Sequence, residues 1–169
     1  MYRLSGLPPP SAARGPPGAV APSADGESLK RVLIAAQLHE VGAAVSHGDY
    51  HKHSAYLIEH GDLPGFSTSD QKSIAELVLG QRGNLRKVSS LLEEPERAAA
   101  LLALRLAVIL SHARRDVVFD RWTLRFARTI DFGLERAWLD QHPLSRHLLE
   151  EEAEQWQKVG VRFSIRELS

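Results

Sequence analysis

Five of the eight histidines of this chain fall within residues 35–67: His39, His47, His51, His53 and His60. Imidazole titrates near neutral pH, ligates divalent metals and pairs with anions, so the cluster suggests a metal site, an anion site or a hydrogen-bonded scaffold. His51 and His53 would share one side of an extended segment but not one face of a helix. Lys52 between them disfavours a nearby dication. We favour the scaffold over the metal site, because a buried polar group generally needs only a hydrogen-bond partner.

Residues 38–42 (LHEVG) resemble the LHD-(I/V)-G signature of HD-domain metal-dependent phosphohydrolases. In those enzymes adjacent His and Asp residues ligate a divalent metal that activates water. Here Glu40 replaces the Asp, Gln81 stands where a later His is usual, and Val108 stands where an Asp is usual. The helical period also predicts that Val108 is buried. Because ligand number decides such sites, we expect no metal at the degenerate His39–Glu40 pair and no catalytic residue in this chain.

Cationic side chains also gather in loops and at helix ends of the first part of the chain. The candidates for binding polyphosphate are His47, His51, Lys52, His53, Arg82, Arg86 and Lys87, with Arg114 and Arg115 further along. Such side chains hold phosphate as point charges or planar forks. Residues 30–128 carry 14 Lys and Arg against 11 Asp and Glu. That excess is small, so a solvated helix surface and a real anion-binding patch stay equally open.

Apolar residues recur at helical spacing over 28–41, 51–60, 68–80, 85–92 and 95–115. The last of these is the most apolar and is interrupted only by Arg105, so we expect it to be the central core helix. Ser67 and Asp70 are spaced as a helix N-cap with an acidic first turn. The motif at 142–143 (His-Pro) opens a later helix that Gly160 closes.

Alternating residues predict strands over 116–127 and 161–167, and we expect the last strand to pair with residues 122–127. The expected fold class is α+β: a mainly helical HD-like domain followed by a small strand–helix–strand unit. The boundary between the two is expected near residues 114–120.

Residues 1–29 hold six of the nine prolines and few bulky apolar side chains. Such a composition buries too little surface to offset its ordering entropy, so we expect a disordered Pro/Gly-rich leader. The formal net charge of the chain is zero, which gives no argument for a membrane surface or for specific nucleic acid. No apolar run is long enough to span a bilayer. The absence of cysteine fits a reducing compartment, and we expect a cytoplasmic protein.

Residues 35–67 (AAQLHEVGAAVSHGDYHKHSAYLIEHGDLPGFS) resemble the hallmark stretch of a known family. The similarity is to the C-terminal region of the exopolyphosphatase / guanosine pentaphosphate phosphohydrolase (Ppx/GppA phosphatase) family. The later segments RWTLRF, HPLSR and VRFSI look like the end of the same region, so the resemblance covers residues 30–168. It implies three parts: the leader (1–29), an HD-like helical domain of Ppx/GppA C-terminal type (30–115) and a small α+β subdomain (116–169).

The resemblance implies that the hydrolytic centre lies elsewhere. Full-length members resemble acetate-kinase/actin-like ATPase folds followed by this region, and their catalytic Glu and glycine-rich phosphate loops lie in the N-terminal half. Residues 1–29 contain no strand–glycine turn–helix unit of that kind. We therefore expect a C-terminal fragment that is inactive alone and needs no cofactor, with Mg²⁺ belonging to the missing catalytic domains. Its expected role is a non-catalytic polyphosphate-binding or dimerisation module.

Two alternatives remain open. One is an autonomous HD-type metal-dependent phosphohydrolase that uses His39 and Glu40. The other is one subunit of a split exopolyphosphatase, with the catalytic domains on a partner chain. The expected partners are polyphosphate or another phosphorylated anion, and either a second copy of this chain or that catalytic chain. The absence of preceding helices predicts an exposed apolar face on the helix at 29–41, which would favour self-association.

Overall fold

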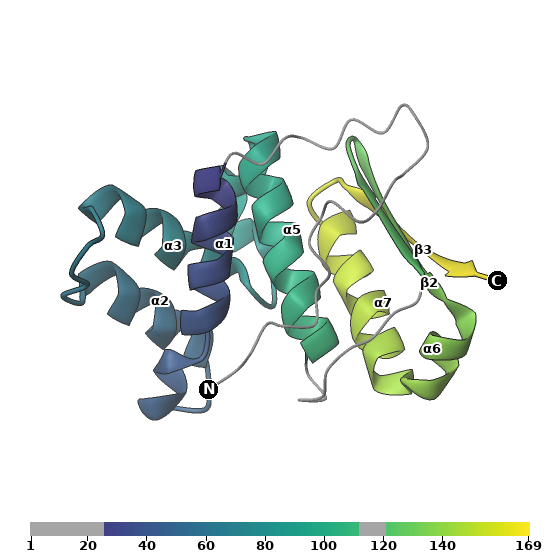
Figure 1. Ribbon diagram of the computed structural model, residues 1–169, viewed down its shortest axis with the longest axis horizontal. Helices are drawn as coiled ribbons and strands as arrows, with labels where there is room; N and C mark the ends of the chain where they lie inside the picture. The colour runs from purple at the N-terminus through teal and green to yellow at the C-terminus, as the bar shows by residue number, and fades with distance from the viewer. Residues whose placement is uncertain (1–25, 112–120) are drawn as a thin grey trace. The chain divides into compact units, whose positions relative to one another are not determined.

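The structure is a computed structural model that describes residues 26–111 and 121–169 (Figure 1). The chain divides into two compact units with the boundary between Val108 and Ile109, and each unit is described by itself. The division into a leader and two domains at residues 29 and 115 stays a prediction. Within the described ranges, no helix combines the length and the apolar character that crossing a bilayer requires.

The first unit is built from helices joined by short turns. They are α1 (Gly26–Leu38), η2 (Val41–Ala44), α2 (Tyr50–His60), α3 (Thr68–Gly80), η3 (Leu85–Val88), α4 (Ser89–Leu92) and α5 (Pro95–Leu110). The predicted disorder of residues 26–29 is wrong, because these residues form the first turn of α1. Glu27 places a carboxylate at the positive end of that helix, and Leu29 starts its apolar spacing. Residues 1–25 lie outside the described part of the chain.

The start of α3 has the predicted cap. The Oγ of Ser67 accepts a hydrogen bond from the amide of Asp70 at 3.1 Å, and an oxygen of the Asp70 carboxylate accepts one from the amide of Ser67 at 3.3 Å. This reciprocal pair satisfies two backbone donors that a helix start leaves without partners. Arg31 of α1 donates to the same carboxylate at 3.2 Å and so ties α1 to α3. The hydrogen bond from Ser67 is the largest cause that lowers the pKa of Asp70.

The core of this unit lies between α2, α3 and α5. Figure 1 shows α2 and α3 side by side, and Ile58 and Ile74 are buried in these two helices. In α5, Leu101 and Leu104 are buried as the apolar run predicted. A fully buried side chain of this size stabilises the fold by about 1.5–3 kcal/mol. Packing of this kind holds the turns at the ends of α1, α2 and α3 in place.

The second unit contains a three-stranded sheet and two helices. The elements are β1 (Trp122–Phe126), β2 (Thr129–Glu135), α6 (Arg136–Gln141), α7 (Pro143–Gln157) and β3 (Arg162–Leu168). The strand order is β1-β2-β3, with β1 antiparallel and β3 parallel to β2. The predicted pairing of the last strand with residues 122–127 is therefore wrong, because β2 lies between them. The predicted strand residues 116–120 lie outside the described part.

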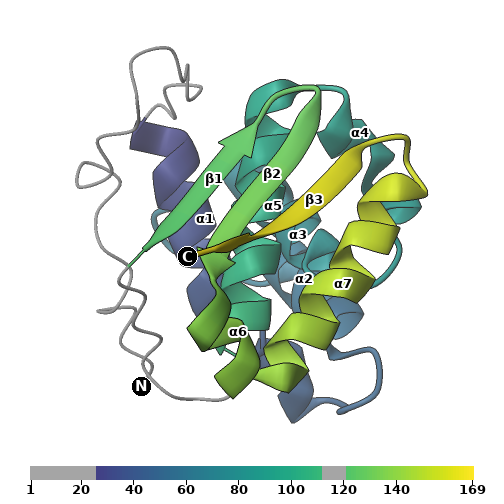
Figure 2. The same ribbon diagram turned by 90° about the vertical axis from the view of Figure 1, so that its right-hand side faces the viewer.

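One face of the sheet packs on α7. Ile130, Phe132 and Leu134 alternate along β2 and are buried, and the ring centroid of Phe126 lies 6.1 Å from that of Trp156 in α7. The buried indole of Trp156 donates to the Glu152 carboxylate at 2.6 Å. Turning from Figure 1 to Figure 2 brings the opposite face into view, with no helix of this unit in front of it. The expected α+β class, mainly helical and then a small mixed unit, is confirmed.

Candidate functional site

The turn that carries His39 and Glu40 is built on a close approach between η2 and α2. A Cβ atom on Gly42 would lie 2.3 Å from the backbone nitrogen of Ser54 and 2.3 Å from the backbone oxygen of Tyr50. Only glycine fits against the neighbouring backbone at that separation. The hydroxyl of Ser54 bridges the two segments: it accepts from the Gly42 amide at 2.8 Å and donates to the His39 carbonyl at 2.9 Å.

The HD-like positions make structural contacts. The side-chain amide of Gln81, only 2% exposed, donates to the His39 carbonyl at 2.8 Å. His39 uses Nδ1 to donate to the carbonyl of Ala36 at 2.7 Å, and its Nε2 lies 3.9 Å from a Glu40 oxygen. Gln81 thus lies beside the motif, as the resemblance to HD enzymes implied, but it presents a donor to the backbone.

These residues do not fit a divalent-metal centre. In residues 26–111 and 121–169, no group of three or more His, Cys, Asp or Glu side chains could hold a metal ion. Val108, which we predicted to be buried, is half-buried and has no donor atom. With one carboxylate and one imidazole nitrogen near each other, the His39–Glu40 turn lacks the number of ligands that such metals take.

Cations from two segments meet beside the start of α2. The guanidinium of Arg82 lies over the ring of Tyr50, 5.3 Å from its centroid. The amine of Lys87 donates to the carbonyl of Arg82 at 2.7 Å. Lys52 extends from the first turn of α2 and donates to the Asp49 carboxylate at 2.9 Å. We call Lys52, Arg82 and Lys87 the α2 cationic cluster.

Electrostatics confirm that these charges act on one another. Burial lowers the pKa of Lys87 to about 8, with further lowering by Arg105, Lys52 and Arg82, although much of the Lys87 residue is exposed. Burial also lowers the pKa of His51 to about 4, followed by the charges of Lys87 and Arg82. His51 is therefore neutral at pH 7. Burial is the larger cause of both shifts, and the neighbouring cations add a smaller part that a bound anion would offset.

Two buried polar side chains, His51 and Arg105, lie next to this cluster. His51 is 7% exposed, and its Nδ1 is buried without a hydrogen-bond partner in the described chain. Arg105 of α5, 1% exposed, donates to the carbonyl of Gly80 at 2.5 Å and to that of Gly83 at 3.0 Å. Arg105 thus holds the turn from which Arg82 extends. In the sequence, Arg105 stands out only as the charged residue that interrupts the most apolar predicted helix.

The other predicted anion-binding residues lie at the margin of the cluster. His47 is exposed in the turn before α2, and Arg86 is exposed in η3, where Asn84 caps its backbone amide at 2.8 Å. His53 is half-buried, and its charge contributes to lowering the pKa of Asp49, although Lys52 is the largest cause. Within the described ranges, the side chains of these three residues form no hydrogen bond or ion pair with the cluster. Arg114 and Arg115 lie outside those ranges.

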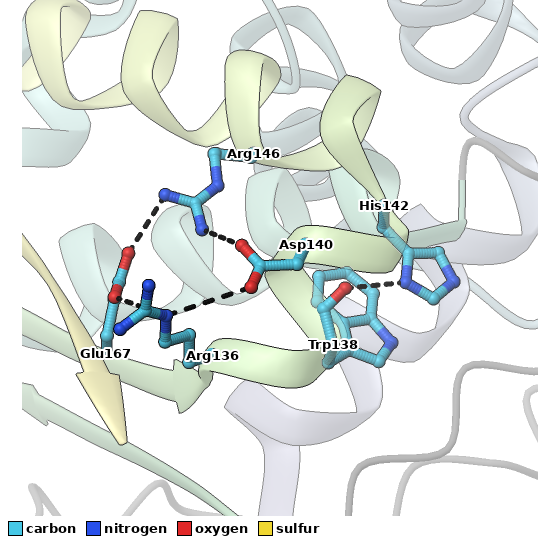
Figure 3. Close-up of polar contacts among 6 residues, drawn as sticks. All are labelled: Arg136, Trp138, Asp140, His142, Arg146 and Glu167. Atoms are coloured by element: carbon cyan, nitrogen blue, oxygen red, sulfur yellow. Dashed lines mark hydrogen bonds and ion pairs between the residues drawn. The ribbon is translucent and has the colours of Figure 1, made fainter. Parts of the chain in front are cut away.

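The second unit holds a polar network that sequence reasoning did not find (Figure 3). Arg146 of α7 donates to Asp140 and to Glu167, each at 2.9 Å, and Arg136 lies 3.8 Å and 3.7 Å from the same two carboxylates. This network joins α6, α7 and β3. Its two arginines and two carboxylates balance, so we interpret it as a structural clamp. Nearby, His142 stacks on Trp138 with ring centroids 4.3 Å apart.

Two hollows of the structure lie away from the α2 cationic cluster. One of about 340 Å³ lies between α1, α3 and α5 and includes Arg31 and Arg97. Another of about 340 Å³ lies at the end of the sheet beside Arg136 and Asp140. Neither includes a residue of the cluster. Lys52, Arg82 and Lys87 are themselves exposed, so the cluster is an open cationic surface, which suits an extended anion better than an enclosed small molecule.

Comparison with known proteins gives two concordant results. The sequence model of "Ppx/GppA phosphatase, domain III" matches residues 19–153. A guanosine-5'-triphosphate,3'-diphosphate pyrophosphatase of Pseudoalteromonas translucida (strain TAC 125) is 37% identical over 141 residues, covering 81% of this chain and 28% of that enzyme. The chain therefore spans little more than a quarter of the length of this curated relative. The family match begins inside the predicted leader and ends before β3.

Proposed function

This chain belongs to the Ppx/GppA phosphatase family through the C-terminal region of that family, and we propose that it acts as a non-catalytic module that binds polyphosphate or another phosphorylated anion. The observation that carries the proposal is the α2 cationic cluster, in which Lys87 is hydrogen-bonded to the backbone of Arg82 and the charges of Arg82 and Lys52 both act on Lys87. Asp49 is the carboxylate that faces these cations, and Lys52 already pairs with it. Amines and guanidinium groups of this kind bind phosphate through charge-assisted hydrogen bonds.

The proposal also concerns where in the family hydrolysis takes place. In the HD-like turn, Ser54 and Gln81 donate hydrogen bonds to the His39 carbonyl, whereas an HD phosphohydrolase would have metal ligands in this region. We infer that hydrolysis by a Ppx/GppA protein needs parts of the family that this chain does not match, and that this module presents the anionic chain to them. Mg²⁺ would belong to those parts, and we place the whole assembly in the cytoplasm.

The proposed association is with a second copy of this chain or with a chain that carries catalytic domains. Leu29 and Leu33 are each 45% exposed on α1, as the apolar face predicted. Exposed apolar residues at a spacing of four form a continuous patch on a helix. Analytical ultracentrifugation of the purified chain tests self-association directly, and a monomer at all concentrations would leave the catalytic chain as the partner to seek.

Lys87→Gln should weaken polyphosphate binding about tenfold, because it removes one charge-assisted contact worth about 1.4 kcal/mol. Isothermal titration with long-chain polyphosphate at low ionic strength measures this affinity. Binding by the wild-type chain should also weaken steeply with added salt, as expected when cations neutralise phosphates. Lys72→Gln, which removes an exposed lysine of α3, is the matched control and should bind as the wild type does. Equal affinity of the Lys87 and Lys72 variants would overturn the proposed site.

Polyphosphate affinity should also fall as the pH rises from 7 to 9. The amine of Lys87 has a pKa of about 8 in the free protein. It is protonated and attracts the anion below that value, and it loses its charge as the pH rises through it. Lys87→Arg keeps its charge throughout this range, so its affinity should fall less. The ratio of wild-type to Lys87→Arg affinity, measured at several pH values, isolates this residue, and a constant ratio contradicts the assignment.

A further inference from the structure

The face of the β1-β2-β3 sheet that points away from α7 can be assigned residue by residue from the strand register. Ile130, Phe132 and Leu134 of β2 are buried on the α7 side. Successive residues of a strand alternate between faces, so Thr129, Asp131 and Gly133 lie on the opposite side. We call this opposite side the outer face. It is the face turned toward the viewer in Figure 2.

Arginines occupy the positions beside β2 on the outer face. Arg125 of β1 pairs in register with Asp131, and β3 places Arg162 beside Thr129 and Arg166 beside Gly133. All three arginines are exposed. Their positions follow from the same alternation, because their neighbours Phe126 and Phe163 pair in register with the buried Ile130.

Within the described residues, most of this positive charge is not paired with a carboxylate. Arg166 donates to Asp131 at 2.9 Å and is still 66% exposed on its side chain. In the described part of the chain, the side chains of Arg125 and Arg162 form no hydrogen bond or ion pair. Two further exposed arginines flank the face: Arg128 in the turn between β1 and β2, and Arg121, which donates to the Ser169 carbonyl at 2.7 Å.

The shape and chemistry of the outer face restrict its ligand. Neighbouring strands lie about 4.8 Å apart, so Arg125 and Arg162 emerge on the two sides of β2 roughly 10 Å or more from each other. Arg162 and Arg166 are separated by about 13 Å along β3. Such spacing on an open surface fits an extended polyanion. Guanidinium forks match phosphate oxygens bidentately, and Thr129 and Ser164 add hydroxyl donors between them.

Among the described residues, the outer face offers no aromatic side chain on which a nucleobase could stack. Among the residues that the structure describes on β1, β2 and β3, the aromatic ones fall on the α7 side by alternation: Trp122, Phe126, Phe132 and Phe163. Single-stranded nucleic acid is normally held by stacking its bases on aromatic side chains, and each stacked base contributes substantially to affinity. A chain made of phosphate alone needs no such platform.

We propose that the outer face, through Arg125, Arg162 and Arg166, binds successive phosphate groups of linear inorganic polyphosphate. The inference rests on the proposed function and adds a second contact surface in the other unit of the chain. The two surfaces differ in character: the α2 cationic cluster combines lysines with one arginine, whereas the outer face uses arginines alone.

Amide chemical-shift mapping of the full chain separates this inference from the proposed function. Titration with long-chain polyphosphate should shift amides of β1, β2 and β3 as well as those near Lys52 and Lys87. Shifts confined to the α2 cationic cluster would overturn the inference and leave the proposed function standing. Shifts confined to the sheet would support the inference and overturn the proposed site. The absence of any shift would overturn both.

Variants of the outer face give a second readout. The double variant Arg125→Gln, Arg162→Gln should weaken polyphosphate binding about tenfold or more and reduce its salt dependence. Lys158→Gln, which removes an exposed cation of the same unit outside the face and outside the clamp, is the control. Asp131→Asn removes the carboxylate at the centre of the face and frees Arg166, so affinity should rise roughly threefold.

The choice of ligand is tested by competition. At equal concentration of phosphate groups, single-stranded DNA should displace polyphosphate from the sheet less well than unlabelled polyphosphate does. Equal or better displacement by DNA would overturn the assignment to polyphosphate. Unchanged affinity of the double arginine variant, or weaker binding by Asp131→Asn, would overturn the outer face as the binding surface.

Discussion

Gly42→Ala should lower the free energy of unfolding by about 3 kcal/mol, the upper part of the range for overpacked sites. The added Cβ would lie 2.3 Å from two backbone atoms, the nitrogen of Ser54 and the oxygen of Tyr50. Backbone cannot move aside as the end of a flexible side chain can, so η2 and α2 must separate. That separation also breaks the hydrogen bond from the Gly42 amide to the hydroxyl of Ser54.

Urea unfolding followed by far-ultraviolet circular dichroism measures this loss. Gly26→Ala is the control, because a Cβ there meets no atom within 4 Å and lies in the first turn of α1. Alanine is favoured over glycine in a helix, so this control should be neutral or stabilising by a few tenths of a kcal/mol. If the two variants unfold at the same urea concentration, the close approach of η2 and α2 is not a determinant of stability.

Arg105→Met should also lower the free energy of unfolding by about 3 kcal/mol. Methionine fills a similar volume among the apolar neighbours in α5 but donates no hydrogen bond. The carbonyls of Gly80 and Gly83 would lose the guanidinium that binds them at 2.5 Å and 3.0 Å. Hydrogen bonds from a charged group to buried acceptors contribute more than those between neutral groups.

The same substitution has an effect that packing alone would not produce. The charge of Arg105 is the largest of the neighbouring charges that lower the pKa of Lys87. Removing it should therefore raise that pKa from about 8 toward the ordinary lysine range. Nuclear magnetic resonance titration of the Lys87 side chain measures the change. Arg105→Lys keeps the charge and should leave the pKa closer to the wild-type value. Unchanged stability together with an unchanged pKa would show that Arg105 does not support the cluster.

Local patterns predicted the elements of this fold better than their pairing. Ser67 and Asp70 identified the start of α3, and Pro143 marked the start of α7, because caps and first turns depend on residues adjacent in the chain. The partner of β3 was wrong because β2 was missed, although Ile130, Phe132 and Leu134 alternate as a strand should. Strand pairing is set by contacts far apart in sequence, which periodicity does not contain.

The sequence predicted which residues belong to the candidate site, but not their burial or their contacts with one another. Spacing placed Lys52, Arg82 and Lys87 among the candidate cations, and the structure brings these three together. The sequence could not show that His51 is buried and neutral, because burial of that ring depends on how α2 packs. It also gave no role to Arg105. The carbonyls that Arg105 binds lie more than twenty residues away, at the end of α3 and in the turn beyond it.

The carbonyl oxygen of His39 accepts hydrogen bonds from Ser54 in α2 and from Gln81 at the end of α3. One acceptor at the end of α1 therefore connects three helices. Fraying of α1 from its last turn would remove the partner of both donors at once, and both lie in buried surroundings where an unpaired polar group is costly. The ends of α1, α2 and α3 should for this reason open together as a single cooperative segment, with amide exchange governed by one opening equilibrium.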